Sequence, residues 1–175
     1  MHPLRTVATG LVIVYLVVGL NGWDLLADPV GWLLVLLGLA ALKDELPRHG
    51  AVTGAAVVSL AVAALTWVPD WSVGRAVRED ESLGWLASLP ALVFAYLLST
   101  SLAARLPIPW EKRFTLLGWG FVLAAALPVL IYGGGWDWLV PPTGLLVFVL
   151  DVLLVVWLWS VSREPASVDP SEPRT

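Results

Sequence analysis

The sequence predicts an all-α membrane protein: a six-transmembrane-helix bundle built of three helical hairpins. Of its 175 residues, 58% are hydrophobic and only 14% are charged, whereas a soluble domain carries about 25% charged residues. The mean hydropathy is +0.82, and the 11 Trp suit the membrane–water interface, where Trp is enriched. Long apolar runs alternate with short polar stretches, which is the pattern of a multi-pass membrane protein.

The apolar runs define six segments, near 6–21, 29–42, 50–68, 85–104, 114–132 and 142–160. A transmembrane helix needs roughly 20 apolar residues, with about 17 as a lower limit, so the first two segments are short. Helix is the expected form because an open strand cannot satisfy its backbone in lipid. We expect residues 1–160 to form a single six-helix transmembrane domain. The polar, Pro-rich residues 161–175 are expected to form a disordered cytoplasmic tail.

The distribution of Lys and Arg predicts the orientation. With both termini in the cytoplasm, only Arg75 and Arg78 lie outside. The basic residues on the inner side are then Arg5, Lys43, Arg48, Arg105, Lys112, Arg113, Arg163 and Arg174. Because Lys and Arg are enriched in cytoplasmic loops, the sequence predicts N- and C-termini inside.

One short motif occurs twice, on the outer side of the first and the last predicted hairpin. GWDLLADPVGWLL at 22–34 and GWDWLVPPTGLLV at 135–147 share seven identities within twelve positions. We expect the Trp at headgroup level, the Asp in water, the Pro in the first turn of the returning helix and the Gly in a close helix contact. The residues of this outer-loop turn motif are Trp23, Asp24, Pro29, Gly31, Trp136, Asp137, Pro142 and Gly144.

A looser copy of the motif lies at 67–74, in the middle hairpin, and is followed by a longer charged stretch that we expect to be a solvated loop. The three hairpins would then run in the same direction, unlike the inverted repeats of many transporters. The repeat has two alternative explanations. One is common origin of the hairpins, and the other is convergence on residues that suit a tight outer loop.

The segment DLLADPVGWLL at 24–34 resembles a stretch of small, uncharacterised bacterial integral membrane proteins. In those proteins a D-P-x-G-W turn opens an early transmembrane helix that ends in a Gly-Leu-x-x-Leu run, here Gly38 to Leu42. The resemblance implies a multi-pass protein of the bacterial plasma membrane, and it implies no known activity.

Small residues recur at every fourth position in two neighbouring segments. The segment 50–68 carries Ala51, Ala55, Ser59 and Ala63, and the segment 85–104 carries Ala87, Ala91, Ala95, Ser99 and Ala103. Such faces let helix backbones approach closely. We therefore expect these two segments to form the closest helix pair.

Asp151 is the only charged residue within the six segments. An Asp near the middle of a span costs about 2.5–3.5 kcal/mol on insertion scales, so it must find hydrogen-bond partners or water. Counting from the span ends places Tyr15, Ser59 and Tyr96 near the same depth. We expect these four residues to form an intramembrane polar site. It is either a proton-linked or ligand-contacting site, or an interhelical hydrogen bond worth about 0.6–2 kcal/mol.

The residue inventory bears on activity. The chain has no Cys, and its two His, His2 and His49, both flank apolar runs. Disulfides and Cys nucleophiles are therefore excluded, and neither a Ser–His pair nor metal-ligand spacing is found. We expect no enzyme, no catalytic residue, no metal site and no cofactor.

Two functions remain from different classes. The first expectation is a non-enzymatic scaffold, accessory or envelope protein. The alternative is a small transporter or a membrane-embedded substrate-binding subunit that uses Asp151. The expected partners are the lipid bilayer and either another membrane protein or a second copy of the chain, but no nucleic acid. A ligand-sized cavity reaching Asp151 favours transport, whereas a dry bundle favours the scaffold.

Overall fold

The structure is a computed structural model that describes residues 3–16, 19–20, 23–24, 28–67 and 71–163. Its helices are α1 (Pro3–Tyr15), α2 (Asp28–Ala40), α3 (His49–Trp67), α4 (Ser72–Glu79), α5 (Glu81–Ala103), α6 (Trp110–Gly134) and α7 (Val140–Val161), with a 3-10 turn η1 (Asp137–Leu139) before α7. Between α1 and α2, the two-residue strands β1 (Gly19–Leu20) and β2 (Trp23–Asp24) pair in antiparallel fashion.

In the described part of the chain, four helices are long and apolar enough to cross a membrane: α3, α5, α6, and α7 together with η1. The helices α1 and α2 are also apolar, but each has only 13 residues. At 1.5 Å per residue they measure about 20 Å, less than the roughly 30 Å of a hydrocarbon core. The chain is thus an all-α protein with the helices of a multi-pass membrane protein.

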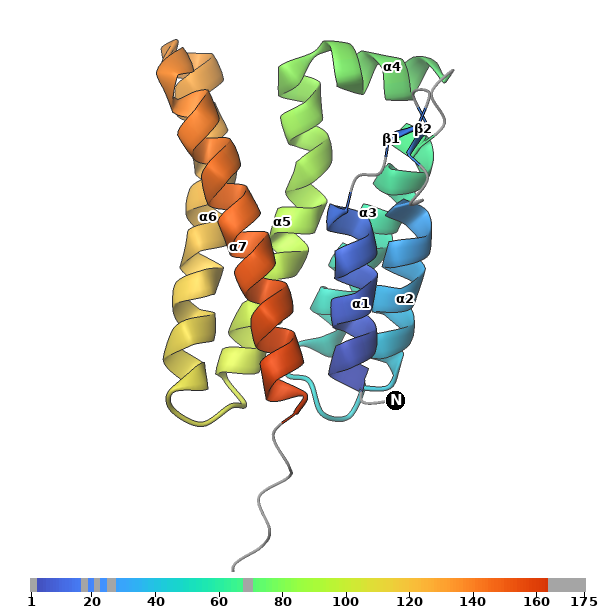
Figure 1. The fold of residues 1–175 in the computed structure, drawn as a ribbon, viewed down its shortest axis with the longest axis vertical. Helices are drawn as coiled ribbons and strands as arrows, with labels where there is room; N and C mark the ends of the chain where they lie inside the picture. Colours follow the sequence, from blue (N-terminus) through green and yellow to red (C-terminus); the bar gives the residue numbers. More distant parts are fainter. Residues whose placement is uncertain (1–2, 17–18, 21–22, 25–27, 68–70, 164–175) are drawn as a thin grey trace, which may run out of the picture.

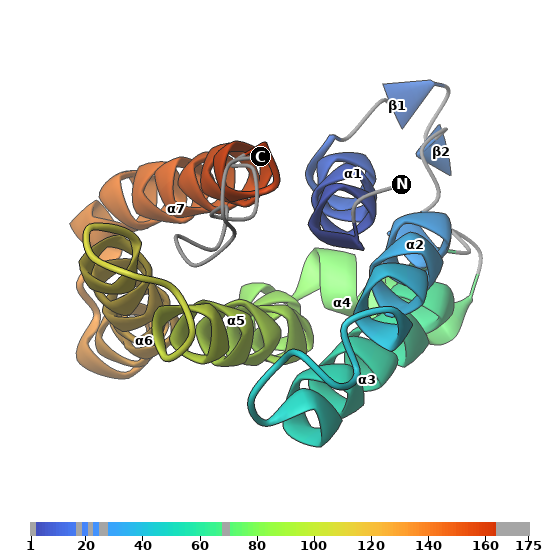
Figure 2. The same cartoon turned by 90° about the horizontal axis from the view of Figure 1, so that it is seen from below.

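The long axes of six helices run up and down the molecule, and α4 lies across one end, between α3 and α5 (Figure 1). Each helix packs on the next: α1 on α2, α2 on α3, α3 on α5, α5 on α6 and α6 on α7. α7 then returns to contact α1, so that the six helices form a ring, as seen along the bundle in Figure 2.

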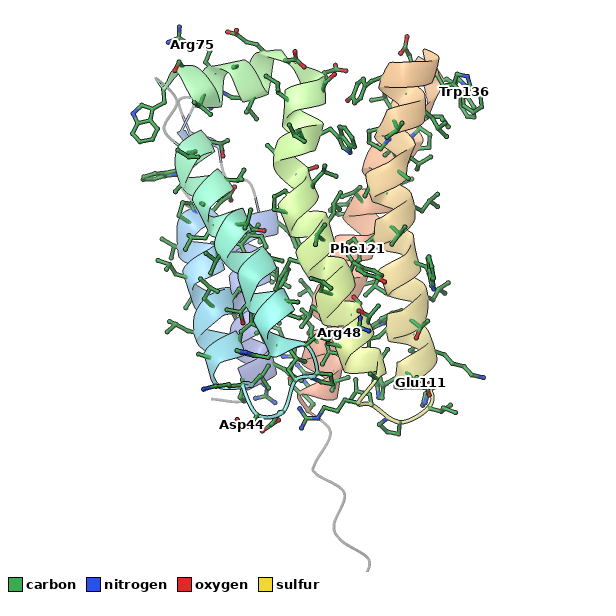
Figure 3. All side chains as sticks on the ribbon, turned by 180° about the vertical axis from the view of Figure 1, so that it is seen from behind. Asp44, Arg48, Arg75, Glu111, Phe121 and Trp136 are labelled. Atoms are coloured by element: carbon green, nitrogen blue, oxygen red, sulfur yellow. The ribbon has the colours of Figure 1, made fainter. Side chains whose placement is uncertain are left out.

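The two ends of the bundle differ in charge and in packing. Arg48 and Glu111 mark one end, and Arg75 and Trp136 mark the other (Figure 3). The first is called here the basic end because it holds the start of α1, the connections 41–48 and 104–109 and the end of α7, with Arg5, Lys43, Arg48, Arg105, Lys112, Arg113 and Arg163. The second is called the splayed end because α5 diverges there from α6 and α7 (Figure 1).

The hydrophobic core lies towards the basic end. Buried residues of α5 all fall between Leu92 and Ala103, in the second half of that helix. Those of α7 fall between Leu150 and Val161, except for Thr143. Large side chains such as Phe94 and Phe121 are fully buried in this core. Two of the cavities described below lie in the half near the splayed end.

The most extensive helix contact joins α1 and α2, followed by that of α5 with α6. Glycines allow it, because a Cβ atom on Gly10 would lie 2.6 Å from the Gly31 carbonyl oxygen, and one on Gly38 would lie 2.6 Å from Cγ2 of Val7. The prediction that the segments 50–68 and 85–104, now α3 and α5, form the closest pair is wrong. Small residues of the two helices line a cavity, whereas glycines bring the backbones of α1 and α2 into contact.

The first predicted segment, 6–21, is wrong at its end. α1 ends at Tyr15, and Gly19–Leu20 belongs to a strand paired with Trp23–Asp24. The dipeptide Asn21-Gly22 stands between the two strands in the sequence, and Asn-Gly is the strongest short-range hairpin signal. The apolar run hid this signal because hydrophobicity alone does not distinguish helix from strand.

The charged loop expected after the middle motif is also wrong, because residues 72–79 form α4 and α5 begins at Glu81. α4 is amphipathic: Gly74 is buried and Val77 is half-buried, while Arg75 is exposed. Asp80 then caps α5, accepting hydrogen bonds from the backbone N–H groups of Ser82 (2.8 Å) and Leu83 (3.1 Å).

The remaining boundaries, of α2, α3, α5, α6 and α7, lie within about four residues of the predicted segments, the usual uncertainty of element ends. α7 ends at Val161, and residues 164–175 of the predicted tail lie outside the described residues.

Candidate functional site

Asp151 lies on α7 against the end of α1. The hydroxyl of Tyr15, the last residue of α1, donates a hydrogen bond to the Asp151 carboxyl group. Near the basic end of the same helix pair, Arg5 Nε donates to Ser162 Oγ at 3.2 Å. The contact that closes the helix ring therefore has a polar link at each end.

A cavity of ≈ 380 Å³ reaches Asp151 from the splayed half of the bundle and is called here the central cavity. Residues of α1, α5, α6 and α7 line it. Its polar side chains are Tyr15, Ser88, Tyr132, Thr143 and Asp151, and its larger apolar ones are Trp85, Leu92, Pro128 and Val147. None of the residues lining it is basic.

Three features of the sequence create this space. α1 stops at Tyr15 and so does not fill the ring near the splayed end. The wall formed by α5 includes the small residues Gly84, Ser88 and Ala91. In α6, Pro128 lacks the N–H that would bond the carbonyl four residues earlier. Close to that point Trp85 Nε1 donates to the Ala125 carbonyl at 3.2 Å, which ties the indole to the cavity wall.

A second cavity, the lateral groove, lies between α1 and α7 and has a volume of ≈ 270 Å³. Tyr15 and Asp151 line it as well, and the other lining residues are apolar: Val12, Leu16, Phe148, Val152, Val155 and Val156. Phe148 and Val156 are 65% and 49% exposed, so this groove is on the outer face of the bundle. The Tyr15–Asp151 pair thus lies between the central cavity and a groove on the outer face of the bundle.

Ser59 and Tyr96, the other members of the expected polar site, line neither of these cavities. Ser59 Oγ donates to the Ala55 carbonyl of its own helix at 2.9 Å. The Tyr96 ring packs near Gly118, where a Cβ atom would lie 3.6 Å from Cδ2 of Tyr96. A single layer of four polar groups is therefore not formed, because equal depth does not determine which way each helix face points.

Ser59 instead lines the α4 cavity, a space of ≈ 170 Å³ beneath Val77 of α4 that Val14, Asp28 and Ala91 also line. Val14 and Tyr15, adjacent at the end of α1, face different cavities. Asp28, which the sequence placed in an outer turn, begins α2 and lines this cavity. The Asp-Pro pair at 28–29 lies at the start of α2, one residue before the predicted start of this segment at residue 29.

Thr143 is a second residue that the sequence argument passed over. It is only 9% exposed, it lines the central cavity, and its Oγ1 has no hydrogen-bond partner among the described residues. Its spacing from Asp151 could have indicated it, since residues i and i+8 lie on one face of a helix.

The two copies of the outer-loop turn motif adopt different local structures. Trp23 and Asp24 form β2, whereas Trp136 is 49% exposed and Asp137 begins η1. Pro29 and Pro142 both lie in the first turn of the helix that follows. Gly31 packs against α1, but a Cβ atom on Gly144 would meet nothing within 4 Å.

No three His, Asp or Glu side chains in the described part of the chain cluster as a metal site would require. The chain matches no family model, no curated protein and no solved structure. The geometry around Asp151 is therefore the evidence that bears on function.

Proposed function

We propose that the protein binds a small molecule within the membrane, as a small transporter or as the membrane-embedded substrate-binding subunit of a larger one. The observation that carries the proposal is the central cavity of ≈ 380 Å³ that reaches Asp151. Ligand sites are concave, mostly apolar and typically about 300–1,000 Å³, with a few convergent polar groups. A scaffold or an accessory or envelope protein, the other function expected from the sequence, would have a packed bundle at this position.

In this proposal α1, α2, α3, α5, α6 and α7 are the six membrane segments, both termini are cytoplasmic and the membrane is the bacterial plasma membrane. The clustering of Lys and Arg at the basic end supports this orientation. The central cavity would then open to the outside.

Cysteine accessibility tests the proposal directly, because the natural chain has no Cys. Val147 lines the central cavity, whereas Val149 is 43% exposed on α7 and lines neither the central cavity nor the lateral groove. Along the α7 axis the two positions differ by about 3 Å, and their side chains point about 200° apart around that axis. They form a matched pair for labelling with a charged, membrane-impermeant methanethiosulfonate applied to intact cells.

We expect Val147→Cys to react and Val149→Cys to remain unmodified, because a charged reagent reaches water-filled space but not acyl chains. Failure of both positions to react, on intact cells and on inverted vesicles alike, would identify a dry bundle and favour the scaffold. Reaction of Val147→Cys only in inverted vesicles would reverse the proposed orientation and leave the binding function standing.

A further inference from the structure

Along α7, the polar residues that line the central cavity lie at the two ends of this wall. On α7 the cavity is lined by Thr143, Val147 and Asp151, which are four residues apart and so follow one face of the helix. Eight residues of helix separate the Cα atoms of Thr143 and Asp151 by about 12 Å. Val147 between them is apolar. A molecule that fits this wall is elongated, polar at both ends and apolar in the middle.

The Thr143 hydroxyl differs from those of five other Ser and Thr residues on the described helices. Ser59, Thr66, Thr100, Thr115 and Ser160 each donate to the backbone carbonyl four residues earlier. Thr143 Oγ1 makes no such bond and has no other partner in the described residues, although it is nine-tenths buried. Ser99 and Ser101 share this lack of a partner but line none of the cavities described above. Because an unmade bond is costly for a buried hydroxyl, Thr143 is available to a ligand.

The opposite end of the cavity lacks a positive charge. The Asp151 carboxyl group accepts a hydrogen bond from the Tyr15 hydroxyl. No Lys, Arg or His lines either the central cavity or the lateral groove. Asp151 is half-buried, and a countercharge stabilises a carboxylate that is partly withdrawn from water; here the ligand can supply it.

We propose that the central cavity binds an elongated organic cation, with a primary ammonium group at Asp151, an apolar middle along Val147 and a hydrogen-bonding group at Thr143. This assignment rests on the proposed function and names the ligand class of the same site. A proton and the ammonium group compete for one carboxylate. Binding to the protonated acid therefore forms the ion pair between the carboxylate and R–NH₃⁺ and releases one proton to water.

Three small probes separate the two ends of the site: tyramine carries both an ammonium and a hydroxyl group, 4-ethylphenol lacks the ammonium, and phenethylamine lacks the hydroxyl. Binding of each to the purified full chain in detergent is measured by isothermal titration calorimetry. We expect loss of the ammonium group to weaken binding at least about tenfold and loss of the hydroxyl about threefold to tenfold, in line with charged and neutral hydrogen bonds.

Two variants assign these losses to residues. Asp151→Asn should remove the preference for tyramine over 4-ethylphenol, and Thr143→Val should remove only the preference for tyramine over phenethylamine. Val149→Ala, outside both the central cavity and the lateral groove, should change neither preference. An unchanged tyramine preference in Asp151→Asn would overturn the assignment of the ammonium group to this carboxyl.

Proton competition adds a second readout. Tyramine affinity should fall as the pH is lowered from about 8 to about 5, whereas 4-ethylphenol affinity should not, and Asp151→Asn should abolish the difference. The other titratable groups lining the central cavity and the lateral groove are Tyr15 and Tyr132, and a phenol does not ordinarily titrate in this range.

The outcomes also separate the ligand class from the proposed function. If 4-ethylphenol binds wild type as tightly as tyramine, the cavity takes neutral molecules and the cation proposal is wrong. If no probe binds a chain whose Val147→Cys reacts with the impermeant reagent, the cation proposal is rejected and the proposed function stands. If no probe binds and Val147→Cys is inaccessible, both are rejected.

Discussion

Gly10 of α1 and Gly31 of α2 lie in direct backbone contact: a Cβ atom on Gly31 would stand 2.7 Å from the Gly10 carbonyl oxygen and 2.6 Å from Cγ2 of Val14. This contact brings the two short helices together more extensively than any other pair. It also sets the position of Tyr15, at the end of α1, opposite α7.

Gly31→Ala should therefore destabilise the protein by about 1–3 kcal/mol, because a methyl group must push two backbones apart. Gly144 occupies the equivalent position in the second copy of the turn motif but has open space around it. Gly144→Ala is the matched control, and it should be neutral or stabilising by up to about 1 kcal/mol through helix propensity. Thermal unfolding in detergent measures both. Equal effects of the two substitutions would contradict the role given to the glycine contact.

Two alanines one turn apart on α5 should respond differently to enlargement. Ala95 is 1% exposed in the core, so Ala95→Leu should cost about 1–3 kcal/mol through overpacking. Ala91 lines both the central and the α4 cavity. Ala91→Leu should have a much smaller effect on the melting temperature and should slow labelling of Val147→Cys by filling the space. A large loss of stability for Ala91→Leu would mean that its surroundings are packed.

The hydrogen bond between Tyr15 and Asp151 should contribute measurably to the closure of the ring. Tyr15→Phe and Asp151→Leu should each cost about 0.6–2 kcal/mol, the range of interhelical hydrogen bonds in membranes. The double variant should cost less than the sum, since both changes remove the same bond. Asp151→Asn should keep the fold, because the side-chain amide oxygen can accept the hydrogen bond that the Tyr15 hydroxyl donates. Additive losses in a thermal unfolding cycle would show that the two side chains act independently.

The orientation can be read from reporter fusions along the chain. Fusions after Trp23 and Trp136 should report the outside, and fusions after Lys43 and at the C-terminus should report the cytoplasm, since Lys and Arg gather at the basic end. Alkaline phosphatase and green fluorescent protein activities measure the two sides. A C-terminus that reports the outside would overturn the orientation drawn from the basic residues.

The sequence sufficed to predict α2, α3, α5, α6 and α7, because each of these helices coincides with a long apolar run. Hydrophobic length is a local property, so the bounds of α3, α6 and α7 lie close to the predicted ones. The two failures, at the end of α1 and at α4, occur where local signals conflict. An apolar run conceals the strand pair around Asn21-Gly22, and a charged stretch conceals the amphipathic pattern of Gly74 and Val77.

The candidate site shows the same division. Asp151 is evident from the sequence because a carboxyl group in the middle of an apolar run is energetically costly. Which of Tyr15, Ser59 and Tyr96 would lie beside it could not be predicted, because depth along a helix can be counted but rotation about its axis cannot. That rotation is decided by packing, and for Tyr15 the glycine contact between α1 and α2 is part of it.

The sequence by itself determined the class of an all-α protein with helices apolar enough to cross a membrane, the approximate helices and the carboxyl group within the last apolar run, since each depends on hydrophobicity and charge read along the chain. Only the tertiary structure decided that α7 closes a ring with α1, that the core fills the basic end, and that a cavity bounded by Thr143 and Asp151 is left near the splayed end. These features depend on how side chains from distant segments fill or fail to fill shared space, and that volume is not a property of any single segment.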